Sequence, residues 1–437
     1  FVEDASSVSN SGQIMRQLLI TEMKGYIGDL TDMIDGGRTF AEGDVVSGLM
    51  FYFDFDSADA GEEFYYTPDN ALQTTWGEIS TKNLKGKIAG NDSATDHRPW
   101  TDQEDGTLSE FSGFPAEGVT SPETLVMHWF NEIEDQALLR ADGDADALAN
   151  PVFLTPDGVD RQQLIQKFLT GAVTFSQGAD DYMDDDLDGK GLKAGTDCAK
   201  EDDDVTCKKY SGLEHAWDEG FGYFGGARNY GELTAAEIKA NENDADGDGT
   251  IDLIKEYNWG ASVNAAKRDV GSAELSAATD LVGEAWEGFY GGRAIIAAAS
   301  HDVDGLSDAE MDDLKAHRDM AIGAWEKAIA ATVVHYINDV RKDIMSASPS
   351  TPEEFSFGDF AKHWGEAKGF GLWFQFNPNS PMTDAQFEEL HDALGQTAPK
   401  WTPDGGGDYM TWYAELEAAR TLLGEVYGFD AELLENW

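Results

Sequence analysis

The fold of this protein is set by SDAEMDDLKAHRDMAIGAWEKAIAATVVHYINDVRKDI, residues 307–344, in which apolar residues recur every three and four positions. This spacing puts them on one face of an α-helix, because an α-helix makes one turn about every 3.6 residues. The same period occurs in four other stretches: residues 11–30, 161–183, 273–300 and 408–428. The sequence therefore predicts an all-α protein.

Two parts of the chain lack a helical period. Residues 48–68 mix aromatic and acidic side chains, and residues 76–125 are rich in Gly, Pro and Asp. Such compositions are typical of surface loops. We expect long acidic loops here, with at most a short hairpin.

The chain contains two similar short segments, which we call the echo motifs. WDEGFGY at 217–223 and WGEAKGF at 364–370 share the frame WxExxG followed by an aromatic residue, and each is preceded by a histidine, His215 or His363. Chance similarity between amphipathic helices is one explanation, and duplication of a helical unit is the other. We favour duplication.

Two duplicated helical bundles follow from this interpretation. The first covers residues 1–258 and carries the long loop insertions, and the second covers residues 259–437. A chain of 437 residues is long enough to bury two cores.

The charge of the chain is extreme. It has 84 acidic and 30 basic residues, a formal net charge of −54. Such a chain repels phosphate backbones, so we expect no nucleic-acid partner. Solvated acidic faces in salty surroundings and capture of cations at specific points both account for the excess. No stretch approaches about eighteen uninterrupted apolar residues, so we also expect no membrane span.

Two features predict export. The sequence begins at Phe1 without a methionine, so we expect that a signal or lipoprotein leader has been removed. Cys198 and Cys207 lie in a polar loop without the spacing of a zinc site, which favours a disulfide. Disulfides persist in oxidising compartments, so the sequence predicts an extracytoplasmic protein, periplasmic or lipid-anchored at the cell surface. Two free thiols in a cytosolic protein are the alternative.

Two acidic segments resemble calcium-binding loops. In NENDADGDGTIDLIKEY, residues 241–257, carboxylates recur at alternate positions and Gly249 stands where such a loop turns sharply. Lys255 replaces the expected bidentate glutamate, with Glu256 one position later. MDDDLDGKG, residues 183–191, repeats only the opening of the pattern. The predicted calcium ligands are Asp244, Asp246, Asp248, Thr250, Asp252, Asp184, Asp186 and Asp188.

Calcium at these loops would be structural, because it would neutralise carboxylates that otherwise repel one another. A chelator is then expected to lower the melting temperature. Solvated acidic turns without an ion are the alternative.

Histidine and carboxylate side chains share a helical face in both echo motifs. His215 lies three and four residues ahead of Asp218 and Glu219, and His363 lies three ahead of Glu366. Imidazole with carboxylate is a ligand set for iron or zinc, and helical bundles build metal sites from such pairs on facing helices. The alternative is that each histidine bonds the carboxylate of its own helix.

The long helical stretch adds two polar residues, Glu326 and His335, to the candidate ligands. A hydrogen bond between these two, or from His335 to a carbonyl, is the alternative. The full set of candidate metal ligands is His215, Asp218, Glu219, His363, Glu366, His335 and Glu326.

Four blocks of sequence carry a resemblance to a known family. They are VSNSGQIMRQLLITEMKGYI (8–27), HAWDEGFGYFG (215–225), AWEKAIAATVVHYIND (324–339) and HWGEAKGFGLWFQFNPNSP (363–381). With these blocks, in this order and over most of its length, the chain resembles a bacterial family filed as a domain of unknown function (DUF4856). The family belongs to the imelysin-like group of secreted or lipid-anchored proteins.

This resemblance implies an all-α fold of two duplicated bundles, export across the inner membrane and a role in iron acquisition. Imelysin itself was classed as a peptidase, and its relatives carry a GxHxxE motif. The best match surrounds His215, but its glycine, Gly212, is three residues ahead of the histidine and Asp218 stands at the third position after it. His363 and Glu366 keep the HxxE spacing without the glycine. These departures weigh against peptidase activity more than against metal binding.

We therefore expect a non-catalytic, extracytoplasmic protein that binds a metal ion or metal complex, with a partner at the outer membrane or cell surface. One alternative is a metal-dependent peptidase or hydrolase in which His215 is a ligand and Glu219 the base. Another is a surface interaction protein whose loop aromatics, Trp76, Trp100 and Phe114, grip a partner or glycan.

Overall fold

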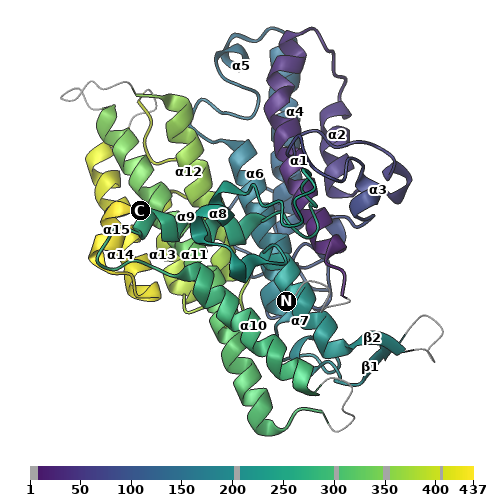
Figure 1. Ribbon diagram of the computed structural model, residues 1–437. Helices are drawn as coiled ribbons and strands as arrows, with labels where there is room; N and C mark the ends of the chain where they lie inside the picture. Colours follow the sequence, from purple (N-terminus) through teal and green to yellow (C-terminus); the bar gives the residue numbers. More distant parts are fainter. Residues whose placement is uncertain (1–7, 201–206, 300–304, 348–354, 404–406) are drawn as a thin grey trace.

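The computed structural model describes residues 8–200, 207–299, 305–347, 355–403 and 407–437 (Figure 1). Within these residues the chain forms fifteen α-helices and one two-stranded hairpin. The predicted all-α fold is confirmed.

The helices of the first part of the chain are α1 (Ser11–Asp35), α2 (Asp44–Phe53), α3 (Trp76–Ile79), α4 (Pro122–Ala141), α5 (Ala145–Ala149), α6 (Arg161–Leu169), α7 (Gly212–Phe224) and α8 (Ala235–Ala240). The later helices are α9 (Gly260–Ser272), α10 (Leu281–Ala299), α11 (Asp308–Ser346), α12 (Phe357–Gly371), α13 (Asp384–Leu394), α14 (Tyr409–Tyr427) and α15 (Ala431–Asn436). The strands β1 (Cys198–Lys200) and β2 (Cys207–Ser211) pair antiparallel.

The longest helix, α11, organises the later part of the chain. Its N-terminus is fixed by a capping box, in which Glu310 donates its backbone N–H to the Ser307 hydroxyl and accepts the N–H of Ser307. α9, α10, α12 and α14 all pack against it. The contact with α10 is close because Gly288 has no side chain, and a Cβ there would lie 2.5 Å from the backbone nitrogen of Ala321.

Residues predicted as one helix from 161 to 183 form α6 and two π-helical segments, Thr170–Phe175 and Gln177–Tyr182. The π-helical segments lie against tryptophan rings. A Cβ on Gly171 would lie 2.4 Å from the Trp373 ring, so only glycine permits this approach. The last of these turns places the Tyr182 ring 5.5 Å from that of Tyr223 on α7.

The helix predicted for residues 273–300 begins later, at Leu281. The carboxylate of Asp269 accepts the backbone N–H groups of Leu281 and Val282. It thereby supplies acceptors for the free N–H groups at the start of α10. The chain before Leu281 folds back on α9 through this contact.

The predicted loops are partly wrong, because residues 48–53 belong to α2. Most of the remaining loop residues run over the surface, but their large rings do not. Trp76, Trp100 and Phe114 are only 1%, 2% and 4% exposed and belong to the hydrophobic core. Burying such rings stabilises the fold, so these three are not available to grip a partner or glycan.

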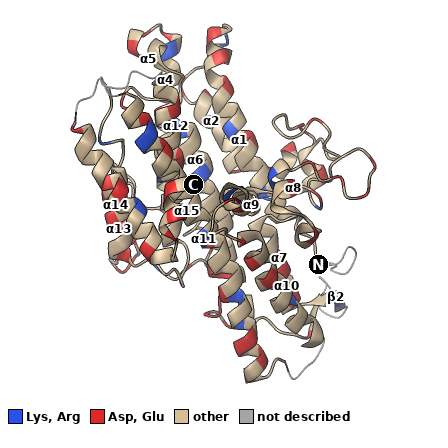
Figure 2. Ribbon diagram, turned by 60° about the vertical axis from the view of Figure 1, so that its left-hand side comes forward, with Lys and Arg blue, Asp and Glu red and all other residues tan. Residues whose placement is uncertain are grey.

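None of the helices in the described ranges is long and apolar enough to cross a membrane, as predicted. Figure 2 shows acidic residues distributed over many helices and loops, with fewer basic ones between them. The division at residue 258 and the duplication stay predictions. α6 packs on α12, and one hydrophobic cluster includes side chains from both predicted bundles.

Candidate functional site

The first echo motif lies on α7. Ser211 caps this helix by accepting the backbone N–H of Glu214. His215 is at its exposed face, with the ring stacked on Tyr210 and Nε2 3.1 Å from Oε1 of Glu219. Burial raises the pKa of Glu219, but the bonds from His215 and the Tyr182 hydroxyl outweigh burial and hold this pKa below its usual value. His215 therefore pairs with its own helix.

Asp218 points to the other side of α7, toward α10. Its Oδ1 lies 2.8 Å from Nε of Arg293, and Oε1 of Glu214 lies 3.0 Å from Nη1 of the same guanidinium. Asp218 is 1% exposed. One buried arginine thus compensates two carboxylates, which explains their place in the motif without a metal.

The second echo motif lies on α12. His363 Nδ1 lies 2.8 Å from Oδ2 of Asp343 on α11. Glu366 is buried, and its Oε1 lies 3.2 Å from the amine of Lys167 on α6. Burial raises the pKa of Glu366, but the charge of Lys167 and the neighbouring lysines outweighs burial and lowers it. The hydroxyl of Tyr336 also bonds this carboxylate.

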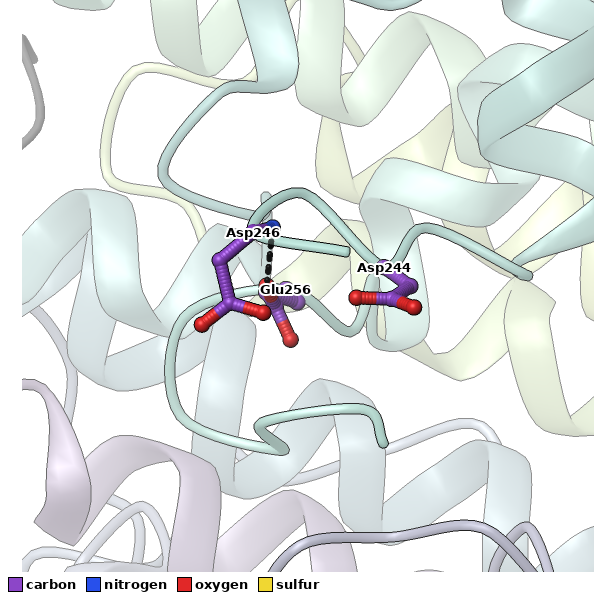
Figure 3. A group of neighbouring side chains, drawn as sticks. All are labelled: Asp244, Asp246 and Glu256. Carbon is purple, nitrogen blue, oxygen red and sulfur yellow. Dashed lines mark hydrogen bonds between the residues drawn. The ribbon is translucent and has the colours of Figure 1, made fainter. Parts of the chain in front are cut away.

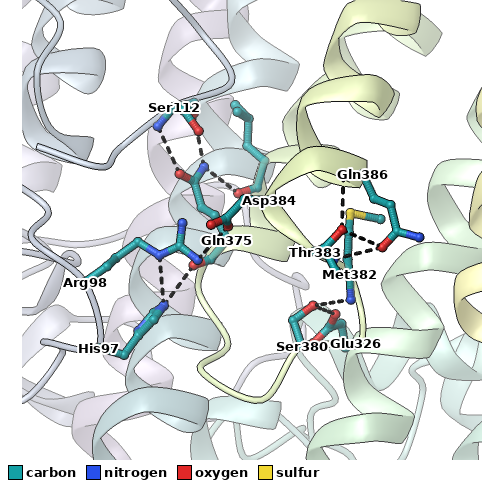
Figure 4. A network of polar contacts seen from close by, with 11 residues as sticks. His97, Arg98, Ser112, Glu326, Gln375, Ser380, Met382, Thr383, Asp384 and Gln386 are labelled. Atoms are coloured by element: carbon teal, nitrogen blue, oxygen red, sulfur yellow. Dashed lines mark hydrogen bonds and ion pairs between the residues drawn. The ribbon is translucent and has the colours of Figure 1, made fainter.

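Glu326 and His335 do not meet, so the predicted bond between them is wrong. Glu326 is buried and accepts from three donors, the amide of Asn377, the hydroxyl of Ser380 at 2.5 Å and the hydroxyl of Tyr427 at 2.7 Å. Figure 4 shows the contact with Ser380. These bonds satisfy its carboxylate inside the core. Nε2 of His335 lies 3.4 Å from Oδ2 of Asp339 instead.

The two histidine motifs lie in separate surroundings. His215 contacts α7 and the residues leading into it, whereas His363 contacts α11. No residue in the described part of the chain is a partner of both imidazoles. The two motifs therefore do not combine into one ligand cluster.

In the predicted calcium loop, Asp244 and Asp246 lie beside Glu256 (Figure 3). One carboxylate oxygen of each lies within 4.8 Å of the others, the only such group found among the described histidine, cysteine and acidic residues. Glu256 was not among the predicted ligands, because the pattern places the last ligand one position earlier, at Lys255. In the structure Oε2 of Glu256 accepts the backbone N–H of Asp252, which turns this side chain toward the loop, and the sequence pattern does not indicate this contact.

The other predicted ligands of this loop have partners of their own. Asp248 accepts the Thr250 hydroxyl at 2.7 Å, and Asp252 accepts the amide of Gln73 at 2.9 Å. Lys255 lies 3.3 Å from Asp252. Calcium binding here stays a prediction.

The second acidic segment does not gather its three aspartates. Asp184 is buried and accepts the backbone N–H of Asp185, and burial raises the pKa of Asp184 to about 6, with Asp186 adding to the effect. Asp186 lies beside Asp96, and Asp188 lies 3.8 Å from the amine of Lys193. The three aspartates of this segment therefore do not form a group like that of Asp244, Asp246 and Glu256.

The hairpin of β1 and β2 carries both cysteines, with Cys198 paired in register with Ser211. The predicted disulfide stays a prediction, because the side chain of Cys207 lies outside the described residues.

A cleft of about 450 Å³ opens where α1, α6, α9, α11 and α12 meet, and Glu366 lies in its wall. Its lining includes one lysine from each of four helices: Lys24, Lys167, Lys267 and Lys362. The rest of the lining includes the rings of Tyr257, Trp259, Tyr336 and Phe370 and the amides of Asn241, Asn258 and Asn264. We call this feature the lysine cleft.

The lysines of the cleft outnumber their counter-charges. Among the described residues, only Lys167 has an ion pair within 4 Å, with Glu366. Burial, followed by the charge of Lys167, lowers the pKa of Lys24 to about 8. Burial and Lys167 also lower the pKa of Lys267. Burial is the largest cause of both shifts, and the charge of Lys167 adds to each of them.

Asn258 adds a hydrogen-bond donor that has no acceptor in the described part of the protein. Its side chain is 1% exposed, and its Oδ1 accepts the backbone N–H of Ala227 at 2.9 Å. Nδ2 of the same amide has no hydrogen-bond partner. A buried donor without an acceptor is costly, and this atom is itself enclosed by protein.

Sequence reasoning missed the lysine cleft. Its four lysines are far apart in the chain and form no motif, and only the packing of α1, α6, α9 and α12 brings them together. No signal for it is visible in the sequence around any one of these lysines.

The fold and the cleft define an all-α protein with a basic pocket in an acidic chain. Residues 78–262 match the family model described as "Domain of unknown function (DUF4856)". This segment includes α7 and the part of the cleft from Gln166 to Gly260, whereas α1, α11 and α12 lie outside it. No curated protein and no solved structure matches the chain. The relation to imelysin stays a prediction.

Proposed function

We propose that this chain is a non-catalytic binding protein for a small molecule that carries two or more negative charges, held in the lysine cleft. The observation that supports it is that the described lining of the cleft includes one lysine from each of four helices and a single carboxylate, that of Glu366. Lys24 and Lys167 are partly buried and lose hydration, and the four lysine amines repel one another. An anionic ligand restores both losses through charge-assisted hydrogen bonds.

The size and chemistry of the cleft suit such a ligand. Its volume of about 450 Å³ lies in the range that holds small molecules. Amides such as that of Asn264 offer donors to the oxygen atoms of carboxylate, phosphate or sulfate groups. Aromatic walls such as Trp259 offer apolar contact to the rest of the ligand. A free metal cation would be repelled by the same lysines.

A metal complex coated with carboxylates belongs to the proposed ligand class. Iron(III) citrate is an example, because its outer atoms are carboxylate oxygens and its net charge is negative. In this form the predicted role in iron acquisition, outside the cytoplasm, agrees with the cleft. Binding rather than hydrolysis is proposed because His215 and Glu219, the pair required by the hydrolase alternative, bond each other away from the cleft.

The test is isothermal titration of the purified chain with phosphate, citrate and iron(III) citrate at low ionic strength. We expect at least one of them to bind, and added NaCl to weaken the binding. Lys24→Met and Lys267→Met are each expected to lower the affinity about tenfold, since a charge-assisted hydrogen bond contributes roughly 1.5 kcal/mol or more. Lys209→Met, at an exposed lysine of β2, is the matched control and should not change it.

Equal affinities of the wild type and both cleft variants, or no binding of any of the three anions, would exclude the proposal. If citrate and iron(III) citrate bind equally, the anion site stands and the role in iron acquisition fails. Thermal melts of the variants show whether a lost affinity reflects the cleft or the fold.

A further inference from the structure

The positive charges of the lysine cleft are not equally available to a ligand. The amine of Lys167 lies 3.2 Å from Oε1 of Glu366 and donates to the side-chain oxygen of Gln166 at 2.7 Å. It also lies 5.4 Å from the centre of the Phe370 ring. The other three lysines of the lining have no carboxylate within 4 Å among the described residues. One lysine is therefore neutralised by the protein, and three are not.

Helix α6 fixes the order in which α1 and α9 meet the cleft. The amide of Gln162 donates to the carbonyl oxygen of Lys24 at 3.0 Å, so Lys24 of α1 lies beside the first half of α6. A Cβ on Gly260, where α9 begins, would lie 3.4 Å from Cγ2 of Thr170, just beyond the end of α6. Lys167 lies between these two points. We call them the α1 side and the α9 side of the cleft.

Lys362 belongs to the α1 side. Helices α6 and α12 run next to each other, since a Cβ on Gly365 would lie 3.1 Å from the carbonyl oxygen of Asp160, and one on Gly369 would lie 2.7 Å from Cβ of Lys167. Lys362 comes about one turn before Gly365 and so lies toward the start of α6. Its charge acts on the amine of the α1 lysine. The unpaired lysines of α1 and α12 therefore share one side.

Lys267 lies on the α9 side. The residues of α9 that line the cleft recur every three or four positions from Gly260 to Lys267, so they share one face of this helix. This helix packs on α11, whereas α1 packs on α6. The charges of Lys167 and Glu366 act on both Lys24 and Lys267, which agrees with a place between them. Unpaired lysines thus occupy two sides of the cleft, with a neutralised pair between them.

The middle of the cleft offers apolar contact. Phe370 lies beside the neutralised pair, as its distance from the amine of Lys167 shows, and the Tyr336 ring stacks on it at 6.2 Å with the planes 11° apart. Both rings line the cleft. The region between the two sides therefore carries little net charge and suits a hydrocarbon segment.

We infer that the ligand of the lysine cleft is an elongated dianion, an α,ω-dicarboxylate or a molecule of the same charge pattern. One carboxylate lies at Lys24 and Lys362, the other lies at Lys267, and the chain between them crosses Phe370. This inference rests on the proposed function and specifies the ligand within it. Each carboxylate gains charge-assisted hydrogen bonds, and the hydrocarbon segment leaves water. A compact dianion such as phosphate reaches only one of the two sides.

The test is titration calorimetry of the full chain with succinate, glutarate, adipate, pimelate and suberate at pH 7 and low ionic strength. Hexanoate, a monoanion with the chain length of adipate, is the reference. The affinity is expected to pass through a maximum within the series. The best dicarboxylate should bind about tenfold more tightly than hexanoate, because its second carboxylate adds charge-assisted hydrogen bonds.

Two variants assign the two sides. Lys267→Met is expected to lower the affinity for the best dicarboxylate about tenfold and to leave that for hexanoate unchanged, because a single carboxylate binds at the side with two lysines. Lys24→Met should weaken the binding of both. Lys209→Met is the control and should change neither. Thermal melts of the variants show that the fold is kept.

The inference is overturned if no dicarboxylate binds more tightly than hexanoate, or if the affinity does not depend on chain length. In either case the proposed function stands when phosphate or citrate binds. If no anion binds at all, both fail. Lys267→Met that weakens hexanoate and the best dicarboxylate equally would contradict the assignment of the two carboxylates to separate sides.

Discussion

The two echo motifs, residues 217–223 on α7 and 364–370 on α12, have similar contacts as well as similar sequences. Trp217 and Trp364 each donate the indole N–H to a backbone carbonyl 2.8 Å away, from Phe289 and Leu394 respectively. The glycines of the frame are equally constrained. A Cβ on Gly222 would lie 2.8 Å from the Asn10 side chain, and one on Gly369 would lie 2.7 Å from Cβ of Lys167. The frame therefore serves helix packing in both places.

The motifs differ in the charges that surround their glutamates. Tyr182 bonds Glu219 and Tyr336 bonds Glu366, so each of the two carboxylates has a tyrosine hydroxyl as a partner. Glu219 lies beside the imidazole of His215, whereas Glu366 lies beside the amine of Lys167, with Lys362 and Lys24 acting at longer range. The residues that the two motifs share specify how their helices pack. The residues contributed by other helices decide which motif faces a ligand.

The largest expected effect of this difference is on stability. Arg293→Met removes the guanidinium that lies 3.0 Å from Glu214 and 2.8 Å from Asp218, two buried carboxylates. We expect a loss of about 3–5 kcal/mol of unfolding free energy, measured by urea denaturation. Lys167→Met is the counterpart on α12. It should cost roughly 1 kcal/mol, because Lys24 and Lys362 still face Glu366.

Equal losses for the two variants would show that the two charge environments do not differ as described. Arg293→Lys keeps the charge but not the two-armed contact, and it should recover part of the stability. Recovery by lysine separates the lost charge from lost packing.

The next effect is on anion affinity. Glu366→Gln removes the only carboxylate among the described residues that line the lysine cleft. It is expected to raise the affinity for citrate about fivefold, as one unit charge at a few ångströms in water contributes about 1 kcal/mol. Glu219→Gln changes the equivalent residue of α7 and should leave the affinity unchanged. Titration calorimetry of both variants measures the difference. A decrease with Glu366→Gln would mean that this carboxylate orders Lys167 for the ligand rather than competing with it.

The helices were predictable because their signal is local. The stretch 307–344 carries its apolar period and its capping residues within itself, and α11 follows it closely. The start of α10 was not predictable in the same way, since Asp269 from another helix fixes it. Burial of Trp76 and Trp100 was missed for the same reason, because loop composition does not reveal what a ring packs against.

The candidate sites show the same limit. His335 and His363 were selected from the sequence by residue type, but their partners Asp339 and Asp343 become visible only when α11 and α12 lie side by side. The spacing of His215 and Glu219 predicted a pair on one helix, and the structure forms that pair. Local spacing thus identifies contacts within a helix, and contacts between helices require the fold.

A smaller effect concerns pH. Lys24 has a pKa of about 8, so it loses its charge between pH 7 and 9, whereas sulfate keeps a constant charge over this range. The affinity for sulfate is expected to fall about threefold as the pH rises through this window, as one of four cationic amines is neutralised. Asp160, Glu366, Lys167 and Lys362 act on the same amine, and burial raises the pKa of Asp160 only to about 6, below the window.

Lys24→Met should flatten this dependence between pH 7 and 9. If the fall persists in that variant, a different group titrates in the cleft, and the assignment to Lys24 is wrong. Measurements in buffers of different ionisation enthalpy add an independent readout, since sulfate binding near pH 8 should take up protons in the wild type only.

The smallest expected effect is on α7. The bond from Glu219 raises the pKa of His215, so the pair stabilises the fold when the imidazole is charged. This contribution is fully present below the unfolded histidine pKa, near 6.5, and is lost as the pH rises through the raised folded value. It is also lost in acid, as the pH falls through the lowered pKa of Glu219. The side chain of His215 is 43% exposed, so solvent screening limits the contribution of the pair to the free energy of unfolding to about a few tenths of a kcal/mol. His215→Gln should therefore lower the melting temperature slightly at pH 6 and leave it unchanged at pH 9, and an equal loss at both values would assign the role of His215 to its stacking on Tyr210.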